Sequence, residues 1–471
     1  MTARTARTFR RAVFCALGLV AFGGAAVASR TPQELTPRPN IVLVLVDDLG
    51  WQDTALQLTP EPPAQNQRWH TPNPTLAPPA WRRNSLDASD TTFPWLLSEA
   101  GYRTIHVGKA HFGAKGTPGE DPRALGFDVN IAGHAAGHPG SYLGRDDFRL
   151  RGRTGVPAAS TFWKVPDLEA WFGSETFLTE ALATHAAEAV EEAVAAGQPF
   201  YLNFAPHAVH TPLRANARLL DHYVGLDERE ATYDTMIESV DNALGTLLAK
   251  LAELGVVDDT VVLFTSDNGG LSAQARGPAP GGARWHTHNA PLKSGKGSAS
   301  EGGVRGPLAA RWPGHTPAGT WSEQPVITYD LFPTFLAMAG SALPEAARAR
   351  MEGHDLGTTL RRGSDATLEG RALFWNQPYQ RGAPGPGIEP CKSVRLGDWK
   401  PPYFYEDRHF ELYDLGRDLG EEHDLAGERP DVTQRLGAEL SDWLVRLQAK
   451  LPFVKDSGSA VPLPRATPTP R

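Results

Sequence analysis

The stretch IVLVLVDDLG, residues 41–50, decides the fold. Its first six residues are apolar and mostly β-branched, which is typical of a strand buried on both faces of a parallel sheet. The run stops at two acids, Asp47 and Asp48. In an open parallel sheet, ligands bind beyond the carboxyl ends of the strands. The stretch therefore predicts a buried sheet and a candidate site at its rim.

Four further segments predict strands of the same kind, and helical periods lie between them. The expected strands are RTIHVGK (103–109), FYLNFAPH (200–207), TVVLFTSD (260–267) and PLAARWP (307–313). The expected helices are 91–101, 175–197 and 231–255. Alternation of strand and helix predicts an α/β fold, with a large mainly parallel sheet flanked by helices across residues 38–370.

The chain changes character after about Leu373. Short strand-like pieces at 371–376, 391–399 and 409–414 precede one helix at 432–450. This pattern predicts a small α+β C-terminal domain over residues 371–452. The remaining residues, 453–471, are proline-rich and are expected to form a disordered tail.

The N-terminus has the pattern of a signal peptide. A basic start and a short apolar run end at Ala26-Val27-Ala28, which predicts cleavage after Ala28. The alternative is an N-terminal membrane anchor. We expect export to the periplasm or the extracellular space, with no stable membrane span after cleavage of residues 1–28.

Composition excludes some partners and cross-links. The formal net charge is −8, and no basic face points to nucleic acid. Removal of the signal peptide leaves Cys391 as the one cysteine, so no internal disulfide is possible.

Oxygen donors follow two of the expected strands. Asp47 and Asp48 end the first, and Asp267 and Asn268 end the strand at 260–267. An all-oxygen site suits Ca²⁺, with Mg²⁺ possible, better than zinc, which more often recruits His or Cys. The competing interpretation is that these side chains only cap the following loops.

Basic groups follow other strands and a glycine-rich stretch. They are Lys109 and His111, His207 and His210, and Lys293 and Lys296. A lone lysine or histidine is usually structural, but here each sits where a parallel strand delivers residues to the same rim as the acids. Lysines and imidazoles around a cation make a pocket for a tetrahedral oxyanion, sulfate or phosphate.

Six segments carry a family resemblance when taken together. They are PNIVLVLVDDLGWQD, GYRTIHVGKAHFG, APHAVHTPL, LFTSDNGG, GKGSASEGGVRGPLAARWPG and ELYDLGRDLGEEHDLA. In this order, from about Pro39 to about Lys450, the chain resembles the sulfatase family of the alkaline phosphatase superfamily. The resemblance implies an alkaline-phosphatase-like fold and hydrolysis of aryl or carbohydrate sulfate esters. The implied partner is a sulfated small molecule or glycan.

The resemblance also implies roles for the candidate residues. The metal ligands for Ca²⁺ would be Asp47, Asp48, Asp267 and Asn268. Lys109 and Lys296 would bind the sulfate group, His111 would hold the nucleophile, and His207 would act at the leaving oxygen as general acid.

The family's nucleophile is the one expected part that we do not find. Sulfatases convert a Cys or Ser in a Cys/Ser-x-Pro-Ser/Thr-Arg motif to formylglycine. That motif should fall between Asn73 and Thr91, where neither Ser85 nor Ser89 precedes the pattern. Cys391, in EPCKSVRLGDW, has its proline in the wrong place and is interpreted as structural.

The stretch HTPNPTLAPPAWRRN, residues 70–84, is interpreted as a junction. HTPN matches the lead-in to the family's nucleophile helix, so a segment would be missing between Asn73 and Pro74. Loss of that helix is expected to expose apolar surface near residues 41–46.

Three hypotheses remain open from the sequence. The first is a sulfatase that has lost an internal segment and is impaired or inactive as written. The second is a non-catalytic Ca²⁺- and anion-binding pseudosulfatase. The third is a metal-dependent phosphoesterase that uses Thr71 or Ser85.

Overall fold

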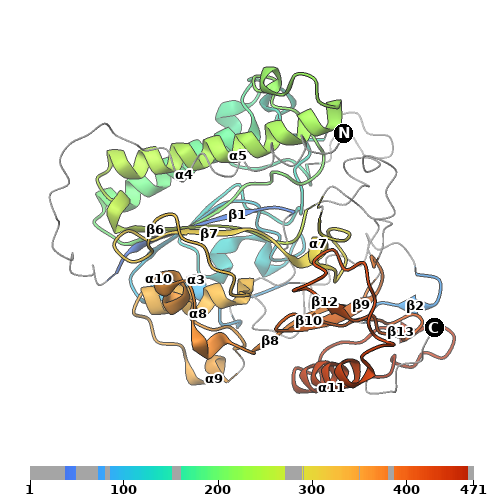
Figure 1. Ribbon diagram of the computed structural model, residues 1–471. Coiled ribbons are helices and arrows are strands. Elements are labelled where there is room, and N and C mark those ends of the chain that lie inside the picture. Colours follow the sequence, from blue (N-terminus) through green and yellow to red (C-terminus); the bar gives the residue numbers. More distant parts are fainter. Residues whose placement is uncertain are drawn as a thin grey trace.

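The central feature is a mainly parallel sheet sandwiched between helices (Figure 1). The computed structural model describes residues 38–48, 73–79, 85–87, 89–150, 161–270, 289, 291–349, 351–379 and 387–464. Within them, the large sheet has six strands in the order β4-β3-β5-β1-β6-β7. The predicted α/β fold class is confirmed.

The strand formed by the apolar run 41–46 lies in the middle of the sheet. β1 (Asn40–Val46) pairs in parallel with β5 (Phe200–Ala205) on one side and β6 (Thr260–Ser266) on the other. β3 (Arg103–Gly108) extends the sheet in parallel beyond β5, and β4 (Val129–Ile131) forms that edge. At the opposite edge β7 (Leu308–Arg311) is antiparallel to β6 and only partly buried, so its expected place among the buried parallel strands was wrong.

Helices cover both faces of this sheet. α4 (Leu178–Ala195) and α5 (Glu228–Glu253) pack on one face, and α3 (Phe93–Glu99) and α8 (Leu331–Met338) pack on the other (Figure 1). Three shorter helices complete this part of the described chain: α7 (Glu301–Val304), α9 (Glu345–Arg348) and α10 (Gly357–Arg362).

The expected exposure of apolar surface near residues 41–46 was wrong. Alternate residues of β1 enter the two cores, Val42 and Val44 on the α4/α5 side and Ile41 and Leu43 on the α3/α8 side. All four are at most 5% exposed. On the α3/α8 side, Phe93, Phe332 and Phe335 pack in the same apolar cluster as Ile41 and Leu43.

The C-terminal part forms an antiparallel sheet covered by one helix. Its strands are β8 (Ala372–Gln377), β9 (Cys391–Leu396), β10 (Trp399–Lys400), β11 (Pro402–Phe404) and β12 (Tyr413–Asp414). α11 (Pro430–Arg446) packs against it, with Trp443 stacked on Phe374 at a ring-centroid distance of 4.8 Å. The small α+β unit agrees with the sequence prediction.

The beginning of the expected disordered tail is ordered. β13 (Phe453–Val454) pairs with β2 (Leu76–Ala77), and Val461 is 1% exposed. Leu76 and Val461 join the apolar cluster of the C-terminal domain, and this burial explains why residues 453–464 take a defined path. The expected signal peptide, residues 1–28, lies outside the described residues.

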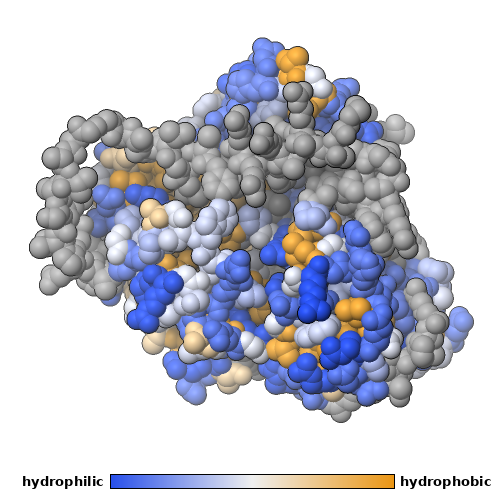
Figure 2. Space-filling model, viewed as in Figure 1, coloured by the Kyte–Doolittle hydropathy of each residue, from blue (hydrophilic) through white to orange (hydrophobic). Residues whose placement is uncertain are grey.

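None of the helices in the described chain is both long and apolar enough to cross a bilayer. On the face in Figure 2, hydrophilic residues dominate and hydrophobic residues are scattered among them.

Candidate functional site

Four strand ends meet at one rim of the large sheet. Val46 pairs with Ser266, so Asp47-Asp48 and Asp267-Asn268 leave the sheet side by side, and the Asp267 amide donates to the Val46 carbonyl at 3.2 Å. The segment after β5 joins them, because Asp47 and the Ala208–Val209 backbone exchange two hydrogen bonds of 3.2 and 3.1 Å.

The end of β3 reaches the same rim. The Lys109 amide donates to the Ala205 carbonyl at 2.7 Å, which sets Lys109 beside the end of β5. Parallel register therefore brings together the acids and the first pair of basic residues, as the sequence predicts.

Two of the carboxylates are buried and paired with lysines. Asp47 is 4% exposed and Asp48 is fully buried. Lys109 Nζ lies 2.5 Å from Asp47 Oδ1, Lys296 Nζ pairs with Asp48 Oδ1, and His210 Nε2 lies 3.7 Å from Asp48 Oδ2. The second oxygen, Oδ2, of each carboxylate has no hydrogen-bond partner.

The surrounding positive charge keeps Asp47 ionised. Burial alone would raise the pKa of its carboxyl, but the charges of Lys109, His210 and Lys296 together outweigh burial and lower that pKa to about 2. At neutral pH the Asp47 carboxylate is therefore negatively charged, and its Oδ2 accepts no hydrogen bond.

The donor chemistry fits a hard divalent cation only in part. Asp47 and Asp48 fit it, since each offers a buried carboxylate oxygen that accepts no hydrogen bond. Asp267 and Asn268 lie at the same rim and are 3% and 9% exposed. However, no three Asp, Glu, His or Cys side chains in the described chain are grouped closely enough to hold a metal ion, so Asp267 does not complete a three-carboxylate cluster.

His207 lies after β5, in the segment that reaches the same rim. It is fully buried, and neither ring nitrogen has a hydrogen-bond partner. Its backbone is held by Tyr142, whose Oη donates to the carbonyls of His207 and His210 at 2.5 and 2.9 Å. Burial, and then the neighbouring His134, keep the pKa of His207 well below its ordinary value.

His111 lies two residues beyond Lys109 in a left-handed conformation, with φ of 58°. Its amide donates to the His134 carbonyl at 3.1 Å. Gly137 leaves room for its ring, since a Cβ there would come within 2.6 Å of His111 Cε1. Burial, followed by the charge of Lys109, lowers the pKa of His111 to about 3.

Two further histidines contact this site and were not singled out from the sequence. The His134 carbonyl accepts the His111 amide. The His138 ring stacks on both His210 and Trp163, with a centroid distance of 5.9 Å to each. Both follow β4 in AGHAAGHPGSY. The rule that parallel strands deliver polar residues to one rim would have found them, but β4 is too short to predict as a strand.

Lys293 does not point into the site. Its Nζ lies 2.8 Å from Tyr413 Oη and 3.5 Å from Glu411 Oε2, in the C-terminal domain. Its expected place among the rim cations was therefore wrong. Sequence spacing alone could not separate it from Lys296, because the two lie three residues apart in an irregular loop.

None of the candidate replacement nucleophiles in the described chain is placed for catalysis. Ser85 is buried, and its Oγ donates to the Leu86 carbonyl at 2.5 Å and accepts from the Gly119 amide at 2.7 Å. Ser89 is exposed and bound to Asp87. Cys391 is buried in β9, where burial raises the pKa of its thiol to about 12. Thr71 lies outside the described residues.

Comparison with known families decides the classification. Residues 55–341 match the family model described as Sulfatase. This chain belongs to the sulfatase family. A second model, described as N-sulphoglucosamine sulphohydrolase, C-terminal, matches residues 296–450, so the sulfatase pattern continues into the C-terminal domain.

Full-length sulfatases align with this chain. A protein described as Sulfatase from Formosa agariphila is 27% identical over 540 aligned positions, covering 93% of this chain and 94% of that protein. The mouse N-acetylgalactosamine-6-sulfatase is 29% identical over 470 positions, covering 91% of this chain and 82% of that one.

Solved structures share the fold of this chain. Ps i-CgsB in complex with k-i-k-neocarrahexaose superposes with a TM-score of 0.64 at 24% identity, covering 86% of this chain and 92% of that one. BT4656 in complex with D-glucosamine-2-N,6-O-disulfate superposes with a TM-score of 0.57 at 17% identity, covering 87% of this chain and 98% of that one. These likenesses establish the architecture of this sulfatase-family hydrolase.

Proposed function

We propose that this chain recognises the sulfate ester of a carbohydrate at the rim formed by β1, β3, β5 and β6. The observation that carries the proposal is the pair of buried ion pairs, Lys109–Asp47 and Lys296–Asp48, beside the unpartnered ring of His207. Buried ammonium groups next to carboxylates with spare oxygens can bind an anion and a cation together.

Each side chain has a role in this proposal. Lys109 and Lys296 donate to sulfate oxygens, and Asp47 and Asp48 hold a divalent cation, Ca²⁺ in preference to Mg²⁺, with Asp267 and Asn268 as further oxygen donors. The cation would supply positive charge that offsets the sulfate and the carboxylates. His207 gives a proton to the leaving alcohol oxygen, and the negative sulfate group favours its protonated form.

A sulfated glycan is the substrate class that the relatives support. The mouse relative is named N-acetylgalactosamine-6-sulfatase, and proteins of similar fold were solved in complex with k-i-k-neocarrahexaose and with D-glucosamine-2-N,6-O-disulfate. The proposal also includes export, on the signal-peptide pattern of residues 1–28.

We further propose that the chain as written turns over poorly because the nucleophile segment is missing between Asn73 and Pro74. No Cys/Ser-x-Pro-Ser/Thr-Arg motif follows Asn73 before Thr91. The alignment to the Formosa protein runs over 540 positions, longer than the 471 residues of this chain, so gaps fall opposite residues of that relative. Loss of a catalytic nucleophile typically costs about 10⁴-fold or more in rate.

The direct test uses the purified chain with N-acetylgalactosamine 6-sulfate, with and without Ca²⁺. We expect binding that requires Ca²⁺ and that falls about tenfold or more in Lys109→Met, with turnover near the uncatalysed rate. Absence of any sulfate-dependent binding would refute the proposal. Lys115→Met is the matched control, because Lys115 is an exposed lysine in the loop that follows the same strand.

The alternative, a natural pseudosulfatase, is favoured by the same missing motif. Sequencing the genomic DNA around codon 73 distinguishes a sulfatase that has lost an internal segment from a natural pseudosulfatase. A correctly assembled reading frame without a missing segment supports the pseudosulfatase, whereas turnover that His207→Ala abolishes excludes it.

A further inference from the structure

The loop that carries Lys296 is bound to the residues that follow Asp267 and Asn268. The Lys296 amide donates to the Gly270 carbonyl at 3.0 Å, and the Gly269 amide donates to the Gly303 carbonyl at 3.0 Å. The loop also closes on itself, since the Gly302 amide donates to the Lys293 carbonyl at 2.9 Å. The position of α7 therefore determines where Lys296 stands.

The backbones of α7 and residues 269–270 pack too closely for either to move independently of the other. A Cβ on Gly269 would lie 1.8 Å from the Gly302 carbonyl oxygen, and a Cβ on Gly302 would lie 2.3 Å from the Lys293 carbonyl oxygen. Backbone atoms packed this closely transmit a displacement rather than absorb it. A shift of Glu301, the first residue of α7, would move both Lys296 and the rim.

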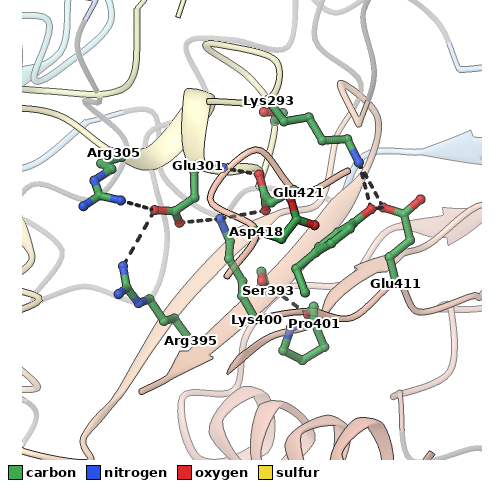
Figure 3. Close-up of polar contacts among 12 residues, drawn as sticks. Lys293, Glu301, Arg305, Ser393, Arg395, Lys400, Pro401, Glu411, Asp418 and Glu421 are labelled. Carbon is green, nitrogen blue, oxygen red and sulfur yellow. Dashed lines mark hydrogen bonds and ion pairs between the residues drawn. The ribbon is translucent and has the colours of Figure 1, made fainter. Parts of the chain in front are cut away.

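Glu301 is held by the C-terminal domain (Figure 3). Lys400 Nζ, on β10, lies 2.8 Å from Glu301 Oε1 and 3.3 Å from Glu421 Oε1. The Glu301 amide donates to Glu421 Oε2 at 2.7 Å, while Arg305 and Arg395 lie 3.3 and 3.7 Å from Glu301 Oε2. We call these five residues the Glu301 network.

The centre of this network is shielded from water. Lys400 and Glu421 side chains are fully buried, and that of Glu301 is 2% exposed. Buried ion pairs add little net stability, but removal of one partner leaves an uncompensated charge and is strongly unfavourable. Such a network fixes geometry more than it stabilises the fold, and the residue whose geometry it fixes is Glu301.

A second contact anchors the same loop. Lys293, three residues before Lys296, binds Tyr413 Oη at 2.8 Å, and Tyr413 Oη donates to Glu411 Oε2 at 2.7 Å. Both ends of the stretch 293–301, Lys293 and Glu301, are thus bound to the C-terminal domain (Figure 3). Lys296 lies between these two anchors in the sequence.

We propose that Lys400 and Glu421 of the C-terminal domain are positioning residues, which act through Glu301 to hold Lys296 where it meets the sulfate group. This inference rests on the proposed function, because it takes Lys296 as a sulfate-binding residue. The C-terminal domain is then part of the active machinery, although none of its described side chains reaches the carboxylate pair.

The test compares Lys400→Met and Glu301→Gln with Lys392→Met as a matched control. Lys392 is also a fully buried lysine of the C-terminal sheet, but its ammonium lies over the rings of Tyr403 and Tyr405, and it makes no described contact with the Lys296 loop. Glu301→Gln keeps the shape of the side chain, so it serves if Lys400→Met fails to fold.

Two readouts are needed for each variant. Amide hydrogen exchange of peptides covering 269–270 and 293–304 reports how firmly the loop is held. The affinity for inorganic sulfate in saturating Ca²⁺ reports its function, and it is measured both alone and in a Lys296→Met background. We expect exchange and sulfate dissociation constants to rise about tenfold in Lys400→Met and Glu301→Gln but not in Lys392→Met.

Each outcome has a defined meaning. In the Lys296→Met background the added cost of Lys400→Met should disappear, because Lys400 acts through Lys296. Unchanged exchange in both network variants overturns the proposal, and so does faster exchange with unchanged sulfate affinity. If the unmodified protein binds no sulfate while exchange still rises in the variants, the proposed function fails and the holding role of the network is supported.

Discussion

At the scale of single residues, the site depends on side chains whose neighbours orient them. His210 approaches Asp48, and its ring is packed against the ring of His138, which in turn stacks on Trp163. The ring planes of His138 and His210 differ by only 9°, so the two rings stack nearly parallel, face to face. The stack orients the His210 imidazole beside the Asp48 carboxylate.

Replacement of His138 by alanine should therefore loosen His210. Stacked aromatic pairs contribute about 0.5–1.5 kcal/mol, which predicts sulfated-saccharide binding weaker by about two- to tenfold. Isothermal titration calorimetry with N-acetylgalactosamine 6-sulfate measures the change. His185→Ala is the control, because that histidine lies on α4 and bonds only to its helix neighbour Glu188 and to Trp171 among its described contacts. An equal loss in both variants would contradict the prediction.

Among the elements, β9 contains a lysine that the fold does not satisfy. Lys392 is fully buried, and its Nζ has no hydrogen-bond partner, although it lies 4.3 Å from the ring centre of Tyr405. Burial holds the pKa of Lys392 well below its ordinary value. The folded state therefore disfavours the charged form that the unfolded chain adopts at neutral pH.

Lys392→Met should raise the free energy of unfolding at pH 7 by about 1–3 kcal/mol, because the variant buries no unsatisfied group. The gain should shrink as the pH rises from the lowered folded pKa toward about 10.4, since the unfolded lysine then loses its proton too. Urea unfolding of both proteins at pH 7 and pH 9.5 checks the sign. A gain that is independent of pH would show that packing, not ionisation, is responsible.

The pair β2 and β13 is the element that was hardest to foresee. Leu76 is 4% exposed within the apolar cluster of the C-terminal domain, although it precedes that domain by some three hundred residues. Leu76→Ala should cost about 2–5 kcal/mol of stability, as buried leucines do. Leu226→Ala is the matched control, since Leu226 is 49% exposed. Similar melting temperatures for the two variants would exclude a structural role for β2.

Sequence patterns predict features that depend on neighbouring residues, and they fail for contacts between residues far apart in the chain. Residues 41–46 and the acids after them could be predicted, because an apolar run and its end are local signals. The pairing of Leu76 with Val454 and the turn of Lys293 toward Tyr413 could not, because both depend on partners remote in sequence. His138 was missed because the strand that precedes it, β4, spans only three residues.

For the whole molecule, the question is what the junction at Asn73 does to the complete site. Asn73 Oδ1 accepts from the amides of Thr75 and Leu76 at 2.9 and 2.7 Å, and its Nδ2 donates to Glu406 Oε2 at 3.1 Å. The first two bonds are local and span the junction between Asn73 and Pro74. They can form only because these residues adjoin, whereas the β2–β13 pairing needs no such adjacency.

Insertion of a relative's segment with its Cys-x-Pro-Ser-Arg motif between Asn73 and Pro74 should therefore break the local bonds at Asn73 and keep β2 against β13. In a host that converts the cysteine to formylglycine, sulfate release should rise by about 10⁴-fold or more, because the other proposed catalytic residues already converge at the rim. The same insertion with alanine for that cysteine is the control. A folded, sulfate-binding insertion variant that stays as slow as this control would mean that more than the nucleophile has been lost. The incomplete carboxylate cluster around Asp267 would then be the next part of the site to question.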